Sequence, residues 1–89
     1  MIEGYILISP DCIDSDNSKN YHIFEARKDE DSGKIYLKLK TSICGNVSVK
    51  YPVRGRFSND LEGLTKFAID KYGKRFCGNC SGVVVSDNR

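Results

Sequence analysis

The fold and chemistry of this chain are predicted most directly by residues 74–82, Lys-Arg-Phe-Cys-Gly-Asn-Cys-Ser-Gly. Two residues separate Cys77 from Cys80, and one of them is a glycine, which allows the positive φ of a tight turn. Such a turn lets both sulfur atoms point at one ion. Because zinc takes about four ligands in a tetrahedron, the pair supplies half of a structural zinc site.

The other two ligands must come from distant parts of the chain. One further cysteine lies in Cys44-Gly45-Asn46, which is typical of a turn between strands, and another lies in a polar, acidic loop. His22 can replace either of these two cysteines. We therefore predict a structural zinc site whose ligands are Cys12, Cys44, Cys77 and Cys80.

Two alternatives stay open, because the ligands of common zinc ribbons and fingers come as two close pairs and these cysteines do not. The cysteines could be unlinked thiols that fill the core, or they could form two disulfides. The first residues, Met1-Ile2-Glu3-Gly4, lack the basic and apolar regions of a secretory signal. We therefore expect a reducing, cytoplasmic location, which counts against disulfides.

The length of 89 residues predicts a single small globular domain over residues 1–89. A domain of this size has a small core, and a structural metal can contribute about 10 kcal/mol to its folding. Residues 1–33 carry eight acidic and three basic side chains, whereas residues 34–89 carry four acidic and eleven basic ones. This asymmetry indicates an anionic partner for the second half, unless the two halves face and neutralise each other.

Apolar runs and alternating apolar residues predict strands over residues 4–8, 21–27, 34–40 and 47–51. The second and third should form a hairpin. In the third, Ile35, Leu37 and Leu39 share the apolar face. Residues 53–57 look like a basic connector, and residues 82–86 look like a last strand.

A single amphipathic helix is expected between the connector and residues 74–82. Asn59 followed by Glu62 has the spacing of a capping box, and Gly73 is placed to end the helix. The resulting order, β-β-β-β-α-β, predicts an α+β fold with a small, mostly antiparallel sheet of about five strands. The apolar stripe of the helix consists of Leu61, Leu64, Ala68 and Tyr72, widened by Phe67 and Ile69.

Catalysis is not expected. A cysteine nucleophile needs a base nearby, and His22 is the single histidine of the chain. The sequence contains no phosphate-binding glycine loop, paired catalytic carboxylates or serine elbow. A zinc ion with four protein ligands also leaves no open position for a substrate. We expect no small-molecule substrate, and no segment is long enough to span a membrane.

The preferred hypothesis is a zinc-stabilised, non-catalytic module that binds nucleic acid through its basic second half. Basic side chains near an aromatic ring can hold phosphates while the ring stacks on a base. The alternative is a small regulatory or inhibitor protein that docks on a larger protein partner by charge complementarity. The candidate nucleic-acid-binding residues are Tyr36, Lys38, Lys40, Lys50, Arg54, Arg56, Lys74 and Arg75.

Overall fold

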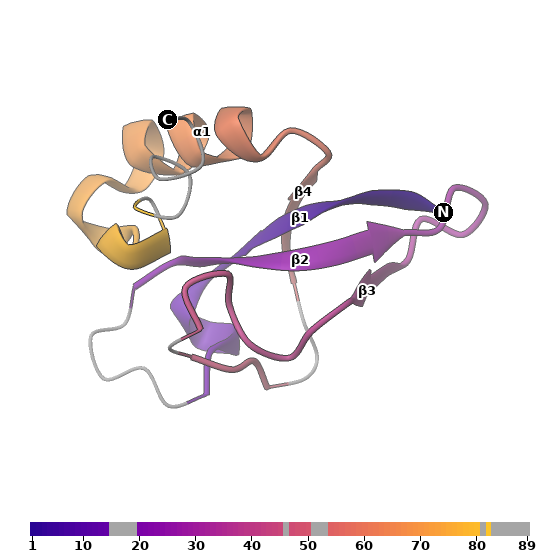
Figure 1. Ribbon diagram of the computed structural model, residues 1–89, viewed down its shortest axis with the longest axis horizontal. Helices are drawn as coiled ribbons and strands as arrows, with labels where there is room; N and C mark the ends of the chain where they lie inside the picture. The colour runs from indigo at the N-terminus through magenta and orange to yellow at the C-terminus, as the bar shows by residue number, and fades with distance from the viewer. Residues whose placement is uncertain (15–19, 46, 51–53, 81, 83–89) are drawn as a thin grey trace.

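A sheet of four strands and one long helix make up the described fold in the computed structural model (Figure 1). The structure describes residues 1–14, 20–45, 47–50, 54–80 and 82. The strands are β1 (Ile2–Ile8), β2 (His22–Lys28), β3 (Ile35–Leu37) and β4 (Gly55–Ser58), and the helix is α1 (Leu61–Tyr72). Two 3₁₀ turns, η1 (Pro10–Cys12) and η2 (Gly73–Arg75), follow β1 and α1.

The sheet is antiparallel throughout, with the strand order β3-β2-β1-β4. The apolar strand β1 is central: Ile6 lies opposite Phe24 of β2 on one side and Phe57 of β4 on the other. The predicted hairpin of β2 and β3 is confirmed. The α+β class and the antiparallel sheet are confirmed too, with four strands in the described residues where about five were expected.

The fourth strand lies elsewhere than predicted. The described residues 47–50 form no ladder and make isolated bridges, Ile13 with Val49 and Thr41 with Ser48. The predicted basic connector instead provides β4, which pairs with β1. Gly55 permits this pairing, because a Cβ atom at that position would collide with the carbonyl oxygen of Leu7. Of the predicted last strand, Gly82 is helical and residues 83–86 lie outside the described residues.

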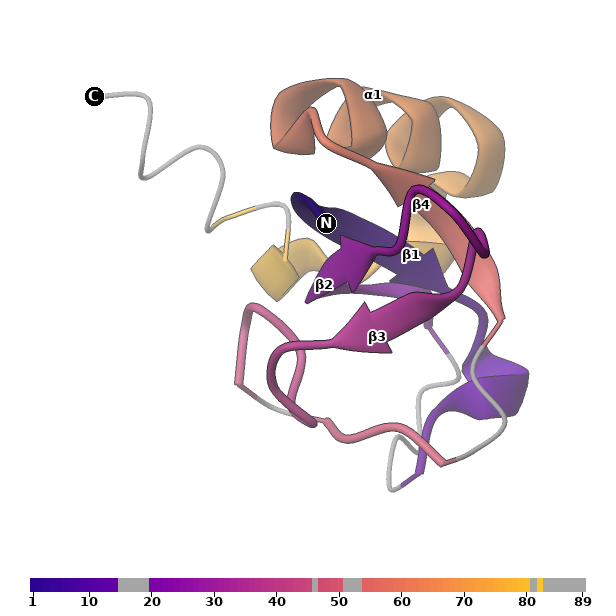
Figure 2. The same cartoon turned by 90° about the vertical axis from the view of Figure 1, so that its right-hand side faces the viewer.

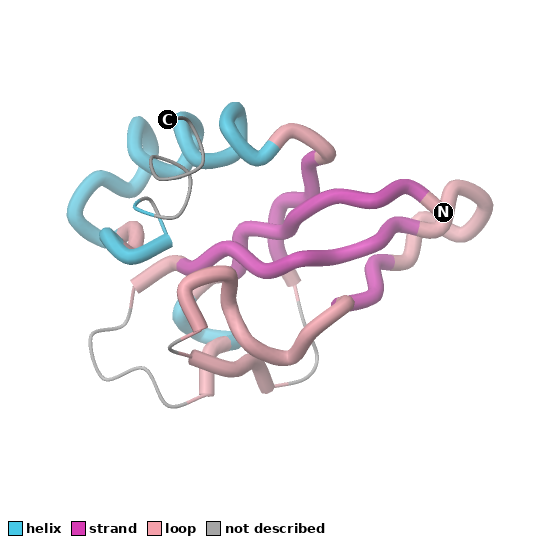
Figure 3. Tube along the Cα trace, in the orientation of Figure 1, coloured by secondary structure: helices cyan, strands magenta, loops and turns pink. Residues whose placement is uncertain are grey.

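Two apolar clusters pack on the two faces of the sheet, because neighbouring residues of a strand point to opposite sides. Ile6 and Ile8 belong to one cluster, and Leu7, between them, belongs to the other. Figures 2 and 3 show α1 on one side of the sheet and η1 with the loops on the other. The loop-side core contains Ile6, Ile8, Cys12, Ile13, Phe24, Ala26, Val47 and Val49. The helix-side core contains Leu7, Ile23, Leu64, Ala68, Phe76, Cys77 and Cys80.

Helix α1 covers the helix-side core with Leu64 and Ala68, as its apolar stripe predicts. Two residues that were predicted to lie on apolar, core-facing surfaces are exposed instead. Ile69 is 47% exposed, and Leu39 is 56% exposed because β3 ends at Leu37. The N-cap is Asp60 rather than Asn59, and no side chain forms a cap hydrogen bond.

Gly73 ends α1 with a φ of +55°, as predicted. No helix among the described residues is both long and apolar enough to cross a membrane.

Candidate metal centre

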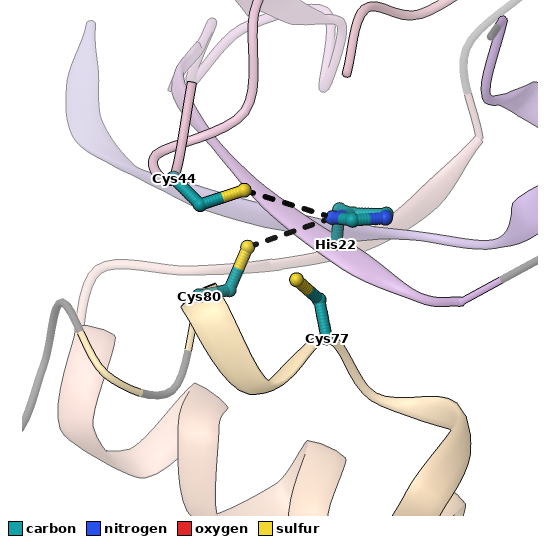
Figure 4. A group of neighbouring side chains, drawn as sticks. All are labelled: His22, Cys44, Cys77 and Cys80. Atoms are coloured by element: carbon teal, nitrogen blue, oxygen red, sulfur yellow. Dashed lines mark hydrogen bonds between the residues drawn. The ribbon is translucent and has the colours of Figure 1, made fainter. Parts of the chain in front are cut away.

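Three segments that are far apart in the sequence meet at the beginning of β2. His22 is the first residue of that strand, Cys44 lies in a turn between β3 and β4, and Cys77 and Cys80 follow η2 (Figure 4). Their ligand atoms, one imidazole nitrogen and three sulfur atoms, all lie within 4.8 Å of one another. The structure therefore gathers one histidine and three cysteines around a common centre.

Backbone hydrogen bonds hold the Cys77–Cys80 segment beside His22. The backbone N–H of Tyr21 donates to the carbonyl of Arg75 (2.6 Å), and the N–H of Cys77 donates to the carbonyl of Tyr21 (2.9 Å). Tyr21 and Phe76 thereby form a short parallel bridge directly before β2. Residues 78–80 are helical, and residues three apart on a helix lie on one side. The Cys-x-x-Cys spacing thus presents both sulfur atoms to the strand.

A tight turn positions Cys44 on the other side of the strand end. The backbone N–H of Ile43 donates to the carbonyl of Ile23 (2.8 Å), which fixes the turn against β2. The turn closes with a bond from the N–H of Gly45 to the carbonyl of Ser42, and Gly45 adopts a φ of +77° that favours glycine. The hydroxyl of Ser42 lies 3.0 Å from the sulfur of Cys44, where it can orient a thiolate.

The distances suit zinc. Sγ of Cys80 lies 3.7 Å, and Sγ of Cys44 lies 4.0 Å, from Nδ1 of His22. With zinc–sulfur bonds of about 2.3 Å and zinc–nitrogen bonds of about 2.0–2.1 Å, a tetrahedron places sulfur and nitrogen ligands about 3.6 Å apart and two sulfur ligands about 3.8 Å apart. Movements of a few tenths of an ångström to about one ångström bring all four atoms to these separations. Three cysteines and one histidine form a closed donor set of a structural zinc site.

Burial makes this site depend on a cation. Cys80 is 0%, His22 3% and Cys77 6% exposed. Burial raises the pKa of the Cys80 thiol, a backbone hydrogen bond from Ile23 opposes the rise, and the neighbouring Cys44 and Cys77 add to it. Three thiolates would repel one another in this apolar setting, so without a metal the Cys80 thiol keeps its proton. The charge of a bound zinc ion reverses this preference and holds thiolates.

The predicted ligand Cys12 does not belong to the cluster, and this prediction is corrected. Cys12 ends η1 and is buried in the loop-side core. Its backbone carbonyl accepts a bond from the N–H of Lys50. His22 takes the fourth position. The sequence had left open that His22 replaces Cys12 as a ligand. No disulfide joins any of the four cysteines.

Four of the eight predicted nucleic-acid-binding residues fall into two groups at opposite edges of the sheet. Tyr36 lies on β3 and Lys38 directly after it, whereas Arg56 lies on β4 and Arg54 directly before it. The β3 group is partly neutralised, because the Glu3 carboxylate accepts a 2.8 Å bond from Lys38 and also pairs with Arg27. Lys40, Lys50, Lys74 and Arg75 are exposed.

Aromatic residues near the β4 group were not identified from the sequence. Tyr21, Phe67 and Tyr72 lie around a hollow that Arg54 and Arg56 also line. Tyr21 was assigned only to a strand, and Phe67 and Tyr72 only to the apolar stripe of the helix. Their proximity depends on β4 pairing with β1, which the sequence did not predict.

Comparisons with models of protein families, with curated proteins and with solved structures found no match to this chain. Functional inference therefore depends on the residues and geometry of the chain itself.

Proposed function

We propose that this chain is a small, non-catalytic binding module, stabilised by a structural zinc ion, that binds nucleic acid through basic side chains of its second half. The observation that carries the proposal is the buried cluster of His22, Cys44, Cys77 and Cys80. Four protein ligands complete a zinc tetrahedron, which leaves no position for a substrate or an activated water. A zinc ion held in this way stabilises a fold rather than performing catalysis.

The charges that remain exposed favour an anionic partner. Arg54, Arg56, Lys74 and Arg75 are exposed, and no carboxylate in the described part of the chain forms an ion pair with any of them. Exposed cations attract the phosphate backbone, because binding releases the counterions that the nucleic acid holds. We further propose a reducing, cytoplasmic location, since zinc-binding thiolates persist where thiols stay reduced.

Fluorescence anisotropy with a labelled single-stranded oligonucleotide of about 12 nucleotides tests this function. Contacts from four cations to phosphates predict that log K falls with log salt concentration with a slope of about −3, at about −0.7 per contact. No binding by the zinc-loaded chain at about 50 mM salt, where such contacts are strong, would refute it.

A second candidate, docking on a larger protein, is favoured by one feature of the β3 edge. Met1, Tyr36 and Leu39 are 66%, 46% and 56% exposed, and they line one open hollow together with Lys38. Exposed apolar side chains that gather in one place often mark protein interfaces. A protein partner that is captured after nuclease treatment, and lost with Tyr36→Ala, would favour this function over nucleic-acid binding.

A further inference from the structure

A basic groove lined by aromatic rings lies between β4 and α1. Its volume is about 380 Å³, near the lower end of ligand sites, which span roughly 300–1,000 Å³. The groove is lined by side chains that lie far apart in the sequence and were not predicted as one site. We call it the arginine–tyrosine groove and define it by Tyr21, Arg54, Arg56, Phe67, Lys71 and Tyr72.

The charge of the groove is of one sign. Arg54, Arg56 and Lys71 contribute three cations, and no acidic side chain among the described residues lines the hollow. None of these cations forms an ion pair within the described ranges of the chain. This differs from the β3 edge, where Glu3 binds both Arg27 and Lys38. The groove therefore keeps its positive charge for a ligand.

The rings hold the cations in place without neutralising them. The guanidinium carbon of Arg56 lies 4.1 Å from the ring centre of Phe67, and the ammonium of Lys71 lies 5.5 Å from the same ring and 5.9 Å from that of Tyr72. A cation over a ring is attracted by the electrons of the ring face. Since the N–H groups at the edge of a guanidinium remain available to phosphate oxygens, Arg56 can stack and bind an anion together.

A stacked pair of tyrosines forms the wall beside these cations. The rings of Tyr21 and Tyr72 are 3.7 Å apart and inclined by 14°, and the ring of Phe67 meets that of Tyr72 edge-on at 6.4 Å. Arg75 continues the series, with its guanidinium carbon 5.6 Å from the ring centre of Tyr21. Cations therefore lie against the aromatic rings all the way from η2 to β4.

Phosphates and flat rings occur together, at the spacing of one repeating unit, in single-stranded nucleic acid. Unpaired bases stack on aromatic side chains and on arginine planes, while lysine and arginine hold the backbone. An acidic protein segment would use the cations but would add no flat ring to the stack of side-chain rings and guanidinium groups. We propose that the arginine–tyrosine groove is the site that binds single-stranded nucleic acid; this inference depends on the proposed function and names its binding site.

The test compares paired variants of the zinc-loaded chain, using the labelled oligonucleotide. Arg54→Gln combined with Lys71→Gln removes two groove cations, and Lys34→Gln combined with Lys66→Gln removes two exposed cations outside the groove as a matched control. The groove variant should bind about tenfold more weakly and lower the magnitude of the salt slope by about 1.4, at about 0.7 per phosphate. The control should bind within about twofold of the unaltered chain.

The stacking contribution is tested with Tyr72→Leu against Tyr5→Leu, because Tyr5 also packs on the helix-side core but does not line the groove. Loss of one base stack should weaken binding roughly 5- to 150-fold for the groove variant, corresponding to about 1–3 kcal/mol, and leave the control unchanged. Tyr72 also packs on the helix-side core. If Tyr72→Leu misfolds, the two double variants, whose substituted side chains are exposed, test whether the groove binds the oligonucleotide.

The possible outcomes separate the two proposals. Binding by the unaltered chain that both double variants retain, or that only the Lys34/Lys66 variant loses, would overturn the groove and leave nucleic-acid binding standing. Equal affinity for the oligonucleotide and for polyglutamate of similar length would overturn base stacking in the groove. No binding by the unaltered chain at low salt would refute both the groove and the proposed function.

Discussion

The identity of the four ligands predicts how many protons the chain releases when it binds zinc. Zinc binds cysteine as the thiolate and histidine as the neutral imidazole. An unperturbed thiol, with a pKa of about 8.5, carries about 0.97 protons at pH 7, and an unperturbed imidazole, with a pKa of about 6.5, carries about 0.24. Three cysteines and one histidine should therefore release about three protons per zinc, whereas four cysteines should release about four.

This count distinguishes the observed cluster from the set of four cysteines that the sequence predicted. Isothermal titration calorimetry of zinc into the metal-free, reduced chain at pH 7 measures the count, when it is repeated in buffers of different ionisation enthalpy. Burial raises the pKa of the Cys80 thiol, so a folded metal-free chain keeps that proton and the expected count stays near three. The apparent zinc affinity should rise about a thousandfold per pH unit near pH 7, because about three protons compete with the metal there.

Cys12→Ser is the matched control for this measurement. Cys12 lies in the loop-side core, away from the cluster, so the proton count and the affinity should stay unchanged. Cys77→Ser should lose the heat of zinc binding, because one of the four ligands is removed. A count near four in the unaltered chain, or a count that falls by one in Cys12→Ser, would refute a site of His22 with three cysteines.

The remaining predictions concern the metal, the sheet and pH. Removing zinc with a chelator should unfold or strongly destabilise the chain, because a structural zinc contributes about 10 kcal/mol and small domains have only about 5–15 kcal/mol of stability; thermal unfolding followed by circular dichroism checks this, and an unchanged melting temperature would contradict it. The same treatment should abolish oligonucleotide binding in anisotropy, since Tyr21 joins the Cys77 segment to the groove. Gly55→Ala should lower the free energy of unfolding in urea by about 1–3 kcal/mol, because the added Cβ would meet the Leu7 carbonyl. Gly78→Ala, whose Cβ would meet nothing within 4 Å, should leave the free energy of unfolding nearly unchanged. Equal effects would argue against the pairing of β1 with β4. Without zinc, any residual free energy of unfolding should fall as the pH rises above about 8.5, because the raised pKa of the Cys80 thiol favours the fold only while the unfolded thiol is also protonated. With zinc bound, the free energy of unfolding should rise with pH. Urea titrations at several pH values measure both slopes, and equal slopes would contradict the assignment of Cys80 as a ligand.

The local parts of the fold could be predicted from the sequence, because their signals lie within a few residues. The apolar run of β1, the alternation at Ile35 and Leu37, and the glycine that ends α1 are signals of this kind. The predicted position of the fourth strand was wrong because β4 has a single large apolar residue, Phe57, among basic and small ones, which gives no strand pattern. Val47 and Val49 alternate because both are buried in the loop-side core, although their backbone makes only isolated contacts.

Only half of the metal site could be predicted, because two of its ligands lie close together in the sequence and the other two do not. Cys77 and Cys80 supply both ligands from one turn, so their spacing is sufficient. The choice between Cys12 and His22 depends on which residues the fold places together, since Cys12 follows β1 into the loop-side core and His22 meets the turn that carries Cys44. No short-range pattern in the sequence contains this information. The groove was missed because it requires β4 to lie beside α1.

The zinc content of the purified chain tests the central claim most directly. The chain should be purified under reducing conditions without added metal and measured by elemental analysis beside Cys12→Ser, His22→Ala and Cys77→Ser. About one zinc per chain is expected in the unaltered protein and in Cys12→Ser, and a loss of zinc together with the fold in the other two. A folded, metal-free protein with four reactive thiols, or a loss of zinc in Cys12→Ser alone, would contradict the structural zinc site.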